Sequence, residues 1–487
     1  FQLDIGDNMS ERKRLNIVVI MFDHQLYYGH GSGNNNVLRP CFEEFSKSAT
    51  VFDNAISCSP LCGPARRSML NGLYPHRHGQ LRNGMTKIVE RTYFDCLKES
   101  GYDSYYFGKF HAGKGTAQML GNSGISPEGY SSPYVLDDYK AYLEERQLPP
   151  PRGYVEFSET DRQYFREGEE VALDGFPFLY TYTFGKLATP DDTHECFYLS
   201  NRVCETLERL ANASSKHPFA VRVDFWGPHH PYFPSDKFLD MYNLNDIDLY
   251  PSFYDDLKDK PSVYAFEQAY HLAKENRIIY PNPLSAKNWR KMLKYAYAQN
   301  SMCDAAAGRI IEKLKALGLY ENTVVIWSAD HGDALCSHGG HIDKNSYMSE
   351  EVLRIPLAVH APDTLPQRSG AFVTNMDIPV TIADYACGSF GVPTDGISLR
   401  PLLGGEKRGR DYFVAETHGH FQKHYARAVC RGDFRFIYNR DMMDELYDLR
   451  NDPYQMRNLC NDPNYSQIKQ NLIDDLNLWR TEYQDKS

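Results

Sequence analysis

Two apolar segments of the chain end in side chains that can bind a hard cation. Asp23 and His24 directly follow the run at 17–22, and Asp330 and His331 closely follow a second run at 323–327. Carboxylates and imidazoles are common ligands of divalent metal ions. A single aspartate in such a place can instead cap the next helix. The shared placement of the two pairs favours a metal site.

A cysteine precedes a short predicted helix later in the chain. Pro64 suits the first turn of a helix that ends near Gly72, so Cys62 is expected at the helix N-terminus. The positive end of the helix dipole would stabilise an anionic nucleophile there. Arg66, one turn along, can reach back to the same atom. The alternative is an ordinary buried cysteine that precedes a helix.

The elements that must position these residues alternate between strands and helices. The β-branched runs at 17–22 and 323–327 are typical of buried strands. Helices are predicted at residues 42–48, 198–213, 286–317 and 377–387. This order predicts an α/β fold, with a large, mostly parallel sheet between layers of helices. Sites in such sheets assemble at the carboxyl ends of the strands, where residues distant in sequence converge.

Two domains are predicted, an α/β catalytic domain over 10–405 and an α+β C-terminal subdomain over 406–487. The subdomain is expected to hold a small antiparallel sheet and a terminal helix. Its predicted elements are strands at 412–416 and 434–438 and a helix at 465–483. Two stretches without clear periodicity, at about 115–195 and 233–285, are expected to shape a substrate pocket.

Composition narrows the classes of partner. The 487 residues are 42% hydrophobic and 24% charged, which is typical of a folded globular protein. A net charge of -11 argues against nucleic acid or an anionic membrane as a partner. No apolar run approaches the roughly 20 residues that cross a bilayer. The eleven cysteines are an odd number, so at least one lies outside any intramolecular pair.

The cysteine segment resembles a known signature. Cys62, Pro64 and Arg66, followed by Leu70 and Gly72, are similar to the Cys-x-Pro-x-Arg and Leu-x-Gly motif of formylglycine-dependent sulfatases in the alkaline phosphatase superfamily. Other segments resemble that family in the same order along the chain. They are Gly108–Gly113, Pro228–Pro231, Ser328–Gly332 with His338, Gly339 and Lys344, and Glu445–Leu449 with Asp452, Pro453, Asn458 and Leu459.

The resemblance implies a formylglycine, made by oxidation of Cys62, beside one divalent metal ion. The implied metal ligands are Asp23, His24, Cys62, Asp330 and His331. Many sulfatases carry two consecutive aspartates where this chain has Asp23-His24, so Gln25 stays open as an alternative ligand to His24. Asp333 is predicted to be a structural cap. Ca²⁺ is the expected ion, and the imidazoles also admit Mn²⁺ or a similar ion.

The resemblance also assigns roles in the reaction. Arg66 and Lys109 would steady the nucleophilic hydroxyl, while Lys109 and Lys344 would neutralise the sulfate oxygens. His229 would contact the substrate and protonate the leaving oxygen, and His111 would be the base that releases sulfate. Taken alone, Lys344 would be expected on the surface. Three further histidines are candidates for the pocket wall: His230, His338 and His341.

The sequence therefore predicts a sulfatase that hydrolyses a sulfate ester, with a carbohydrate favoured over an aryl group. The alternatives are a phosphonate monoester or phosphodiester hydrolase that uses the same site, and a non-catalytic relative that binds a ligand. The expected partners are the anionic ester and a formylglycine-generating maturation enzyme, and the oligomeric state stays open. A natural start at Met9 would imply a cytoplasmic protein, and otherwise a periplasmic or secreted one.

Overall fold

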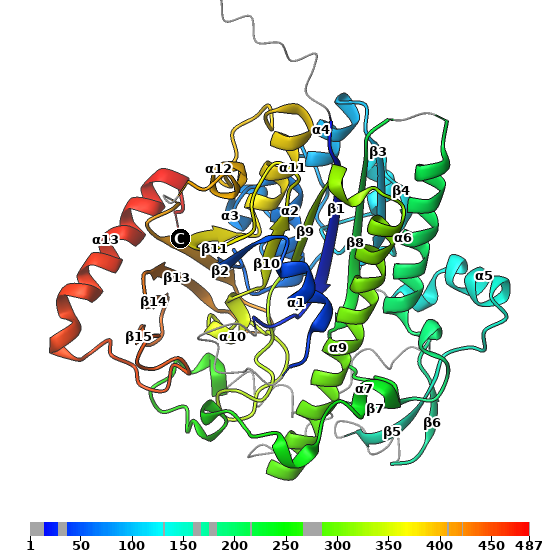
Figure 1. The fold of residues 1–487 in the computed structure, drawn as a ribbon. Coiled ribbons are helices and arrows are strands. Elements are labelled where there is room, and N and C mark those ends of the chain that lie inside the picture. Colours follow the sequence, from blue (N-terminus) through cyan, green and yellow to red (C-terminus); the bar gives the residue numbers. More distant parts are fainter. Residues whose placement is uncertain are drawn as a thin grey trace, which may run out of the picture.

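A large mixed sheet forms the centre of the part of the chain that the computed structural model describes (Figure 1). That part comprises residues 14–27, 37–129, 132–158, 167–174, 183–214, 217–265, 285–406, 409–420 and 422–486. Met9 therefore lies outside the described residues. In spatial order the strands of the sheet are β11 (Gln367–Thr374), β2 (Thr50–Ile56), β10 (Leu357–His360), β9 (Thr323–Ala329), β1 (Asn16–Asp23), β8 (Phe219–Pro228), β3 (Asp103–Gly108) and β4 (Ser123–Ile125).

The direction of the strands confirms the predicted, mostly parallel sheet. β9, β1, β8, β3 and β4 run parallel to one another, and β2 runs parallel to β11. β10 is antiparallel to both of its neighbours, β9 and β2. All eight residues of β1 are buried, as expected for a continuous β-branched run in a sheet covered on both faces.

Helices cover both faces of this sheet (Figure 1). Those described are α1 (Pro40–Ser46), α2 (Cys62–Asn71), α3 (Pro75–His78), α4 (Tyr93–Glu99), α5 (Asp137–Glu145), α6 (Glu195–Asn212), α7 (Asp236–Leu239), α9 (Ala286–Ala316), α10 (Glu350–Leu353), α11 (Asp377–Cys387), α12 (Arg400–Leu403) and α13 (Ser466–Tyr483). Helix α9 packs against α1 and α6, and helix α11 packs against α2 and α4. Five of these helices match the predicted ranges to within a few residues: α1, α6, α9, α11 and α13.

The first predicted insertion contains a small sheet of its own. Its strands are β5 (Arg152–Ser158), β6 (Glu170–Ala172) and β7 (Thr183–Leu187), with β5 in the middle. Gly153 and Gly185 lie on adjacent strands against the ring of Phe233, where a Cβ atom on either residue would clash with the ring. Phe233 begins the second insertion, so the two insertions pack together. Residues 266–284 of the second insertion lie outside the described residues.

A four-stranded antiparallel sheet follows towards the C-terminus, as predicted. Its order is β12 (Phe413–His418), β13 (Tyr425–Arg431), β14 (Phe434–Asn439) and β15 (Glu445–Asp448), and α13 packs against β13 and β14. Glu416 joins this sheet to the main body. Its backbone N–H donates to the carbonyl oxygen of Cys58 at 2.9 Å, and its carboxylate accepts from the backbone N–H of His76 at 2.6 Å. The predicted boundary near residue 405 stays a prediction.

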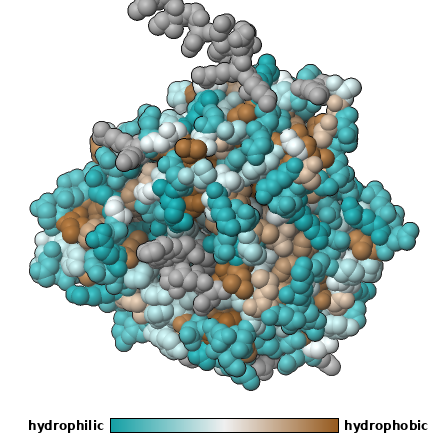
Figure 2. All heavy atoms as spheres, in the orientation of Figure 1, coloured by the Kyte–Doolittle hydropathy of each residue, from teal (hydrophilic) through white to brown (hydrophobic). Residues whose placement is uncertain are grey.

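Figure 2 shows one face that is mainly hydrophilic, with apolar residues scattered over it in small groups. Among the described helices, none combines the length and the apolar composition needed to cross a membrane.

Candidate active site

Four neighbouring parallel strands end at one place on the main sheet. Asp23 is the last residue of β1, and Asp330 follows β9 in the adjacent register. His229 follows β8, which pairs with β1, and Lys109 follows β3, which pairs with β8. Because these strands are parallel, their carboxyl ends bring together residues that are far apart in the sequence. The predicted convergence of the two strand ends is confirmed.

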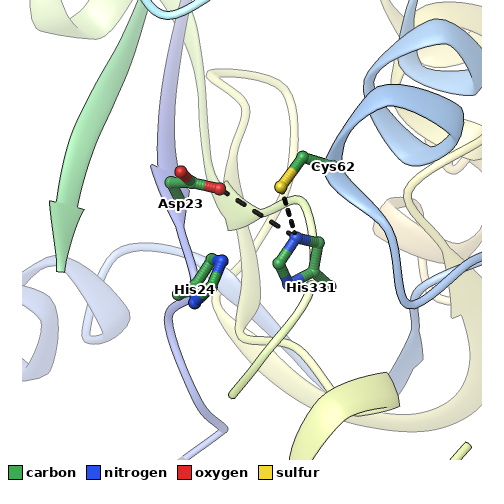
Figure 3. Close-up of side chains that lie close together, drawn as sticks. All are labelled: Asp23, His24, Cys62 and His331. Carbon is green, nitrogen blue, oxygen red and sulfur yellow. Dashed lines mark hydrogen bonds and ion pairs between the residues drawn. The ribbon is translucent and has the colours of Figure 1, made fainter. Parts of the chain in front are cut away.

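Cys62 enters this place from the side, at the start of α2. The helix begins at Cys62 and ends at Asn71, with Gly72 in the left-handed conformation at its C-cap, as predicted. The Cys62 Sγ atom lies 3.1 Å from His331 Nε2 (Figure 3). The same atom lies 4.0 Å from Lys109 Nζ. The side chain is fully buried, and burial raises the pKa of the thiol to about 12. Unmodified Cys62 is therefore a neutral thiol at neutral pH, a poor nucleophile.

The side chains of Asp23, His24, Cys62 and His331 can hold a metal ion together. One ligand atom of each lies within 4.8 Å of the others, and all four residues are buried (Figure 3). Within the described residues, Asp23 Oδ1 and His24 Nε2 have no hydrogen-bond partner. Buried polar atoms are normally satisfied. Carboxylate, imidazole and sulfur donors that converge in this way fit a divalent cation.

Asp330 lies beside this group but is engaged by an arginine. Its Oδ1 is 3.7 Å from His331 Nε2, while its Oδ2 accepts a hydrogen bond from Arg66 Nε at 2.8 Å. Arg66 also donates to Asp224 Oδ2 at 2.6 Å and lies 3.7 Å from Asp23 Oδ1. The guanidinium is thus buried among three carboxylates. In this arrangement Arg66 neutralises the acidic cluster, a contribution that sequence reasoning did not foresee.

Lys109 provides the second buried cation. Its Nζ contacts a carboxylate oxygen of Asp23 and lies 4.3 Å from the ring centroid of Trp226. Burial on its own would raise the pKa of Asp23, but Lys109 and Arg66 outweigh it and lower that pKa well below its usual value. Asp23 is therefore ionised at neutral pH, the form that binds cations.

Two histidines expected to move protons are buried near these cations. His229 Nδ1 lies 2.5 Å from the backbone oxygen of His230, and its ring centroid is 4.0 Å from that of His24. Burial lowers the pKa of His229 well below its usual value, and His230 lowers it further. Burial and the charge of Lys109 lower the pKa of His111 in the same way. Both imidazoles are neutral at pH 7 without substrate.

Lys344 is buried, contrary to the expectation for a lone lysine. Its Nζ lies 2.8 Å from Asp343 Oδ1, and its side chain is 3% exposed. The loop that carries it has several non-glycine residues at positive φ: Leu335, Cys336, His338, Asp343 and Asn345. Such strained conformations cluster at functional sites, where the surrounding structure maintains them.

Asp333 has a different role from the predicted cap, because no helix within the described residues begins directly after it and α10 starts only at Glu350. Its Oδ1 accepts from the backbone N–H of Leu335 at 2.8 Å, a turn within the loop. Its Oδ2 lies 2.7 Å from Nδ1 of His24. Gln25, the alternative ligand, is also buried, and neither atom of its side-chain amide has a hydrogen-bond partner within the described residues.

Two of the three additional pocket candidates have other contacts. His338 Nδ1 lies 3.1 Å from Asp255 Oδ2, and His341 Nε2 lies 2.9 Å from the backbone oxygen of Tyr264. These contacts tie the Lys344 loop to the second insertion and give both histidines a structural role. His230 instead lies beside His24 and His229, with one ring nitrogen of each within 4.8 Å of the others.

Asp224 and Asn83 contribute to the site although sequence reasoning missed them. Asp224 lies inside the apolar strand β8, and Arg222 Nε donates to its Oδ1 at 2.6 Å. A charged pair within a buried strand was the available signal. Asn83 Oδ1 accepts from the backbone N–H of Gly63, next to Cys62, at 2.9 Å. Nothing in its surrounding sequence distinguished it.

Comparison with known proteins assigns this arrangement to a family. A family model described as Sulfatase matches residues 15–389, most of the chain. The chain belongs to the sulfatase family. As a sulfatase, the protein is a sulfuric ester hydrolase. A second model, described as the C-terminal part of N-sulphoglucosamine sulphohydrolase, matches residues 337–482 of this sulfatase.

Relatives and solved structures resemble the sulfatase over nearly its full length. An endo-4-O-sulfatase of Bacteroides thetaiotaomicron is 27% identical, over 88% of this chain and 82% of its own. The structure of a phosphonate monoester hydrolase of Agrobacterium radiobacter has a TM-score of 0.77 at 17% identity, over 96% of both chains. A structure solved in complex with D-glucosamine-2-N,6-O-disulfate has a TM-score of 0.67 at 19% identity, over 98% of this chain and 99% of that one.

Proposed function

We propose that this sulfatase hydrolyses a sulfate ester of a carbohydrate through a formylglycine made from Cys62. The observation that carries the proposal is the position of Cys62 Sγ, which faces His331 and Lys109 where four parallel strands end. The fully buried neutral thiol supports oxidation before use, because a reactive cysteine would need a lowered pKa. Two similar proteins support a carbohydrate as the substrate: the endo-4-O-sulfatase, and the protein whose structure was solved in complex with D-glucosamine-2-N,6-O-disulfate.

A divalent cation is part of the proposed site, with Ca²⁺ as the expected ion and Mn²⁺ or a similar ion as the alternative. Its proposed ligands are Asp23, His24, Asp330, His331 and the modified residue 62. Two buried ligand atoms that make no hydrogen bond within the described residues, Asp23 Oδ1 and His24 Nε2, support this set. The bound cation would stabilise negative charge on the sulfate and on the nucleophilic oxygen.

The cationic side chains are proposed to hold the substrate anion. Lys109 and Lys344 are buried amines whose charges both act on Cys62, and they come from the end of β3 and from the loop after β9. Charge-assisted hydrogen bonds from such amines to sulfate oxygens are strong in a site that excludes water. Arg66 is proposed to steady the hydroxyl indirectly, because its contacts with Asp330 and Asp224 keep the acidic cluster in place.

His229 is proposed to give a proton to the leaving oxygen. Its Nδ1 faces the backbone carbonyl of His230, so Nδ1 carries a hydrogen and Nε2 is the atom that exchanges the catalytic proton. Without substrate the ring is neutral. An adjacent sulfate anion would favour the protonated form, so His229 would become an acid when substrate binds. His111 needs to be neutral to act as a base, which agrees with the direction of its pKa shift.

A phosphonate monoester or phosphodiester hydrolase is the second candidate function. The imidazoles among the proposed ligands support it, because the sequence departs there from the paired aspartates of many sulfatases. Comparison of kcat/KM for a nitrophenyl sulfate and a phenyl phosphonate ester tests the choice. The sulfate should be the better substrate. A preference for the phosphonate by orders of magnitude would contradict the proposed function.

A further inference from the structure

We propose that Asp333 is a positioning residue that fixes the orientation and tautomer of His24, so that His24 Nε2 serves as the metal ligand. This inference rests on the metal site of the proposed function and deepens it. Asp333 does not touch the substrate or the cation in this account, and acts through the imidazole alone.

The contact with Asp333 determines which nitrogen of His24 carries the hydrogen. His24 Nδ1 lies 2.7 Å from Asp333 Oδ2, and both side chains are buried. Burial raises the pKa of the Asp333 carboxyl to about 7. A cation bound at Nε2 would favour the ionised form, which accepts the hydrogen bond that Nδ1 donates. In the neutral imidazole the lone pair then belongs to Nε2. That atom is buried, lies 3.5 Å from Asp343 Oδ1 and makes no hydrogen bond within the described residues.

Asp333 and His24 are each held by a further contact. Its other oxygen accepts from the backbone N–H of Leu335 at 2.8 Å, so the two carboxylate oxygens have separate tasks. His24 is held from its own backbone as well. It adopts φ of 64°, and its N–H points towards Asp330 Oδ1 at 3.4 Å. The imidazole is therefore oriented from both ends.

An imidazole ligand requires such a residue more than a carboxylate ligand does. A carboxylate ligand offers lone pairs on two equivalent oxygens and brings its own negative charge. An imidazole offers one lone pair, on one nitrogen, and is neutral. Where His24 stands in place of a carboxylate ligand, the site loses a negative charge, and the ring must be held so that its single lone pair faces the cation. Asp333 supplies both the charge and the orientation, since a carboxylate hydrogen-bonded to a ligating histidine fixes its tautomer and raises its basicity.

The test measures metal binding to the whole protein after its metal has been removed with a chelator. Calorimetric titration with Ca²⁺, and separately with Mn²⁺, gives the dissociation constant of each variant. Asp333→Ala should weaken binding of the preferred ion by about 10- to 100-fold. Asp333→Asn keeps an oxygen that can accept from Nδ1, so its affinity should lie between those of wild type and Asp333→Ala.

A double-mutant cycle with His24→Ala separates positioning from a merely structural role. In that background Asp333→Ala should change the dissociation constant by no more than about twofold. An equal loss in both backgrounds, or none in either, would overturn the inference. If Asp333→Ala does not fold, Asp333→Asn replaces it in the same cycle. Asp304→Ala is the matched control, since this buried carboxylate accepts from the backbone N–H of Cys41 and Phe42 at α1. It should leave metal affinity unchanged.

The outcomes also separate this inference from the proposed function. If the double-mutant cycle shows the expected coupling between Asp333 and His24 but the protein has no sulfatase activity, the proposed function is refuted and the role of Asp333 is kept. Full sulfatase activity with no coupling between the two residues would do the reverse. A wild-type protein that binds neither ion would contradict both.

Discussion

Removal of the Arg66 guanidinium should destabilise the protein far more than loss of a surface arginine. Arg66 is 1% exposed and contacts Asp330 at 2.8 Å and Asp224 at 2.6 Å. Arg66→Met would remove the cation that bridges these two carboxylates. Asp224 would keep Arg222, but Asp330 would lose its hydrogen-bonded cation. Breaking a buried pair in this way costs about 3–5 kcal/mol of unfolding free energy. The methionine side chain adds buried apolar surface, which stabilises the folded protein. This gain in unfolding free energy should be smaller than the loss, because the neighbouring carboxylates stay in place without the arginine's charge.

The assay is urea denaturation of the metal-free protein, followed by circular dichroism. Urea is preferred to guanidinium chloride because a salt would screen ionic interactions. Arg146→Met is the matched control. Arg146 pairs with Glu205 at 2.6 Å, with side chains 38% and 40% exposed. Loss of that pair should cost at most about 1 kcal/mol.

A divalent cation should recover part of the stability lost by Arg66→Met, because it supplies positive charge to the same carboxylates. Arg66→Lys should fall between the two proteins, since an amine keeps the charge but cannot bridge two carboxylates as a guanidinium can. Equal losses in Arg66→Met and Arg146→Met would refute the reasoning. Such a result would mean that the acidic cluster is ionised without help from Arg66.

Three further predictions concern turnover, substrate affinity and acid stability. His111→Ala should lower steady-state kcat by about 10²–10⁴-fold while the first equivalent of alcohol is still released as a burst, measured by stopped flow; loss of the burst itself would contradict its role in sulfate release. Lys344→Met should raise KM for the sulfate ester by about tenfold or more, because a charge-assisted contact is lost; an unchanged KM would remove Lys344 from the substrate site. Burial alone would raise the pKa of Glu416, but Arg427 and His76 lower it well below its usual value. Its stabilisation is therefore present above the unfolded pKa of about 4.3 and is lost as pH falls through the folded pKa. Glu416→Gln should be less stable than wild type at pH 7, and urea denaturation should show the difference shrinking in acid; a constant difference would contradict this.

The strand ends of the site could be predicted because they depend on short-range patterns. A β-branched run followed by Asp23, and another followed by Asp330, predict two buried strands and their exit points. Parallel pairing then brings the exit points together without further information. The start of α2 at Cys62 was equally predictable, because Pro64 and Gly72 mark the ends of the helix.

The partners of the site residues depend on contacts across the fold and could not be read in this way. Arg66 was expected at the nucleophile, but its carboxylate partners Asp224 and Asp330 come from two other strands. Asp333 was expected to be a cap, but no helix in the described part of the chain begins directly after it, and one of its oxygens reaches His24, which lies more than three hundred residues earlier. Lys344 was surface-like in isolation because its burial depends on the conformation of the surrounding loop.

The central claim is that Cys62 is the precursor of the nucleophile. Mass spectrometry of the peptide that contains Cys62 tests it most directly, on protein produced in a host with the maturation enzyme and matched to the sulfatase activity of the same sample. The account predicts the mass of a formylglycine at position 62, with activity proportional to its fraction and absent in Cys62→Ala. Fully active protein with an unmodified thiol at Cys62 would contradict the account.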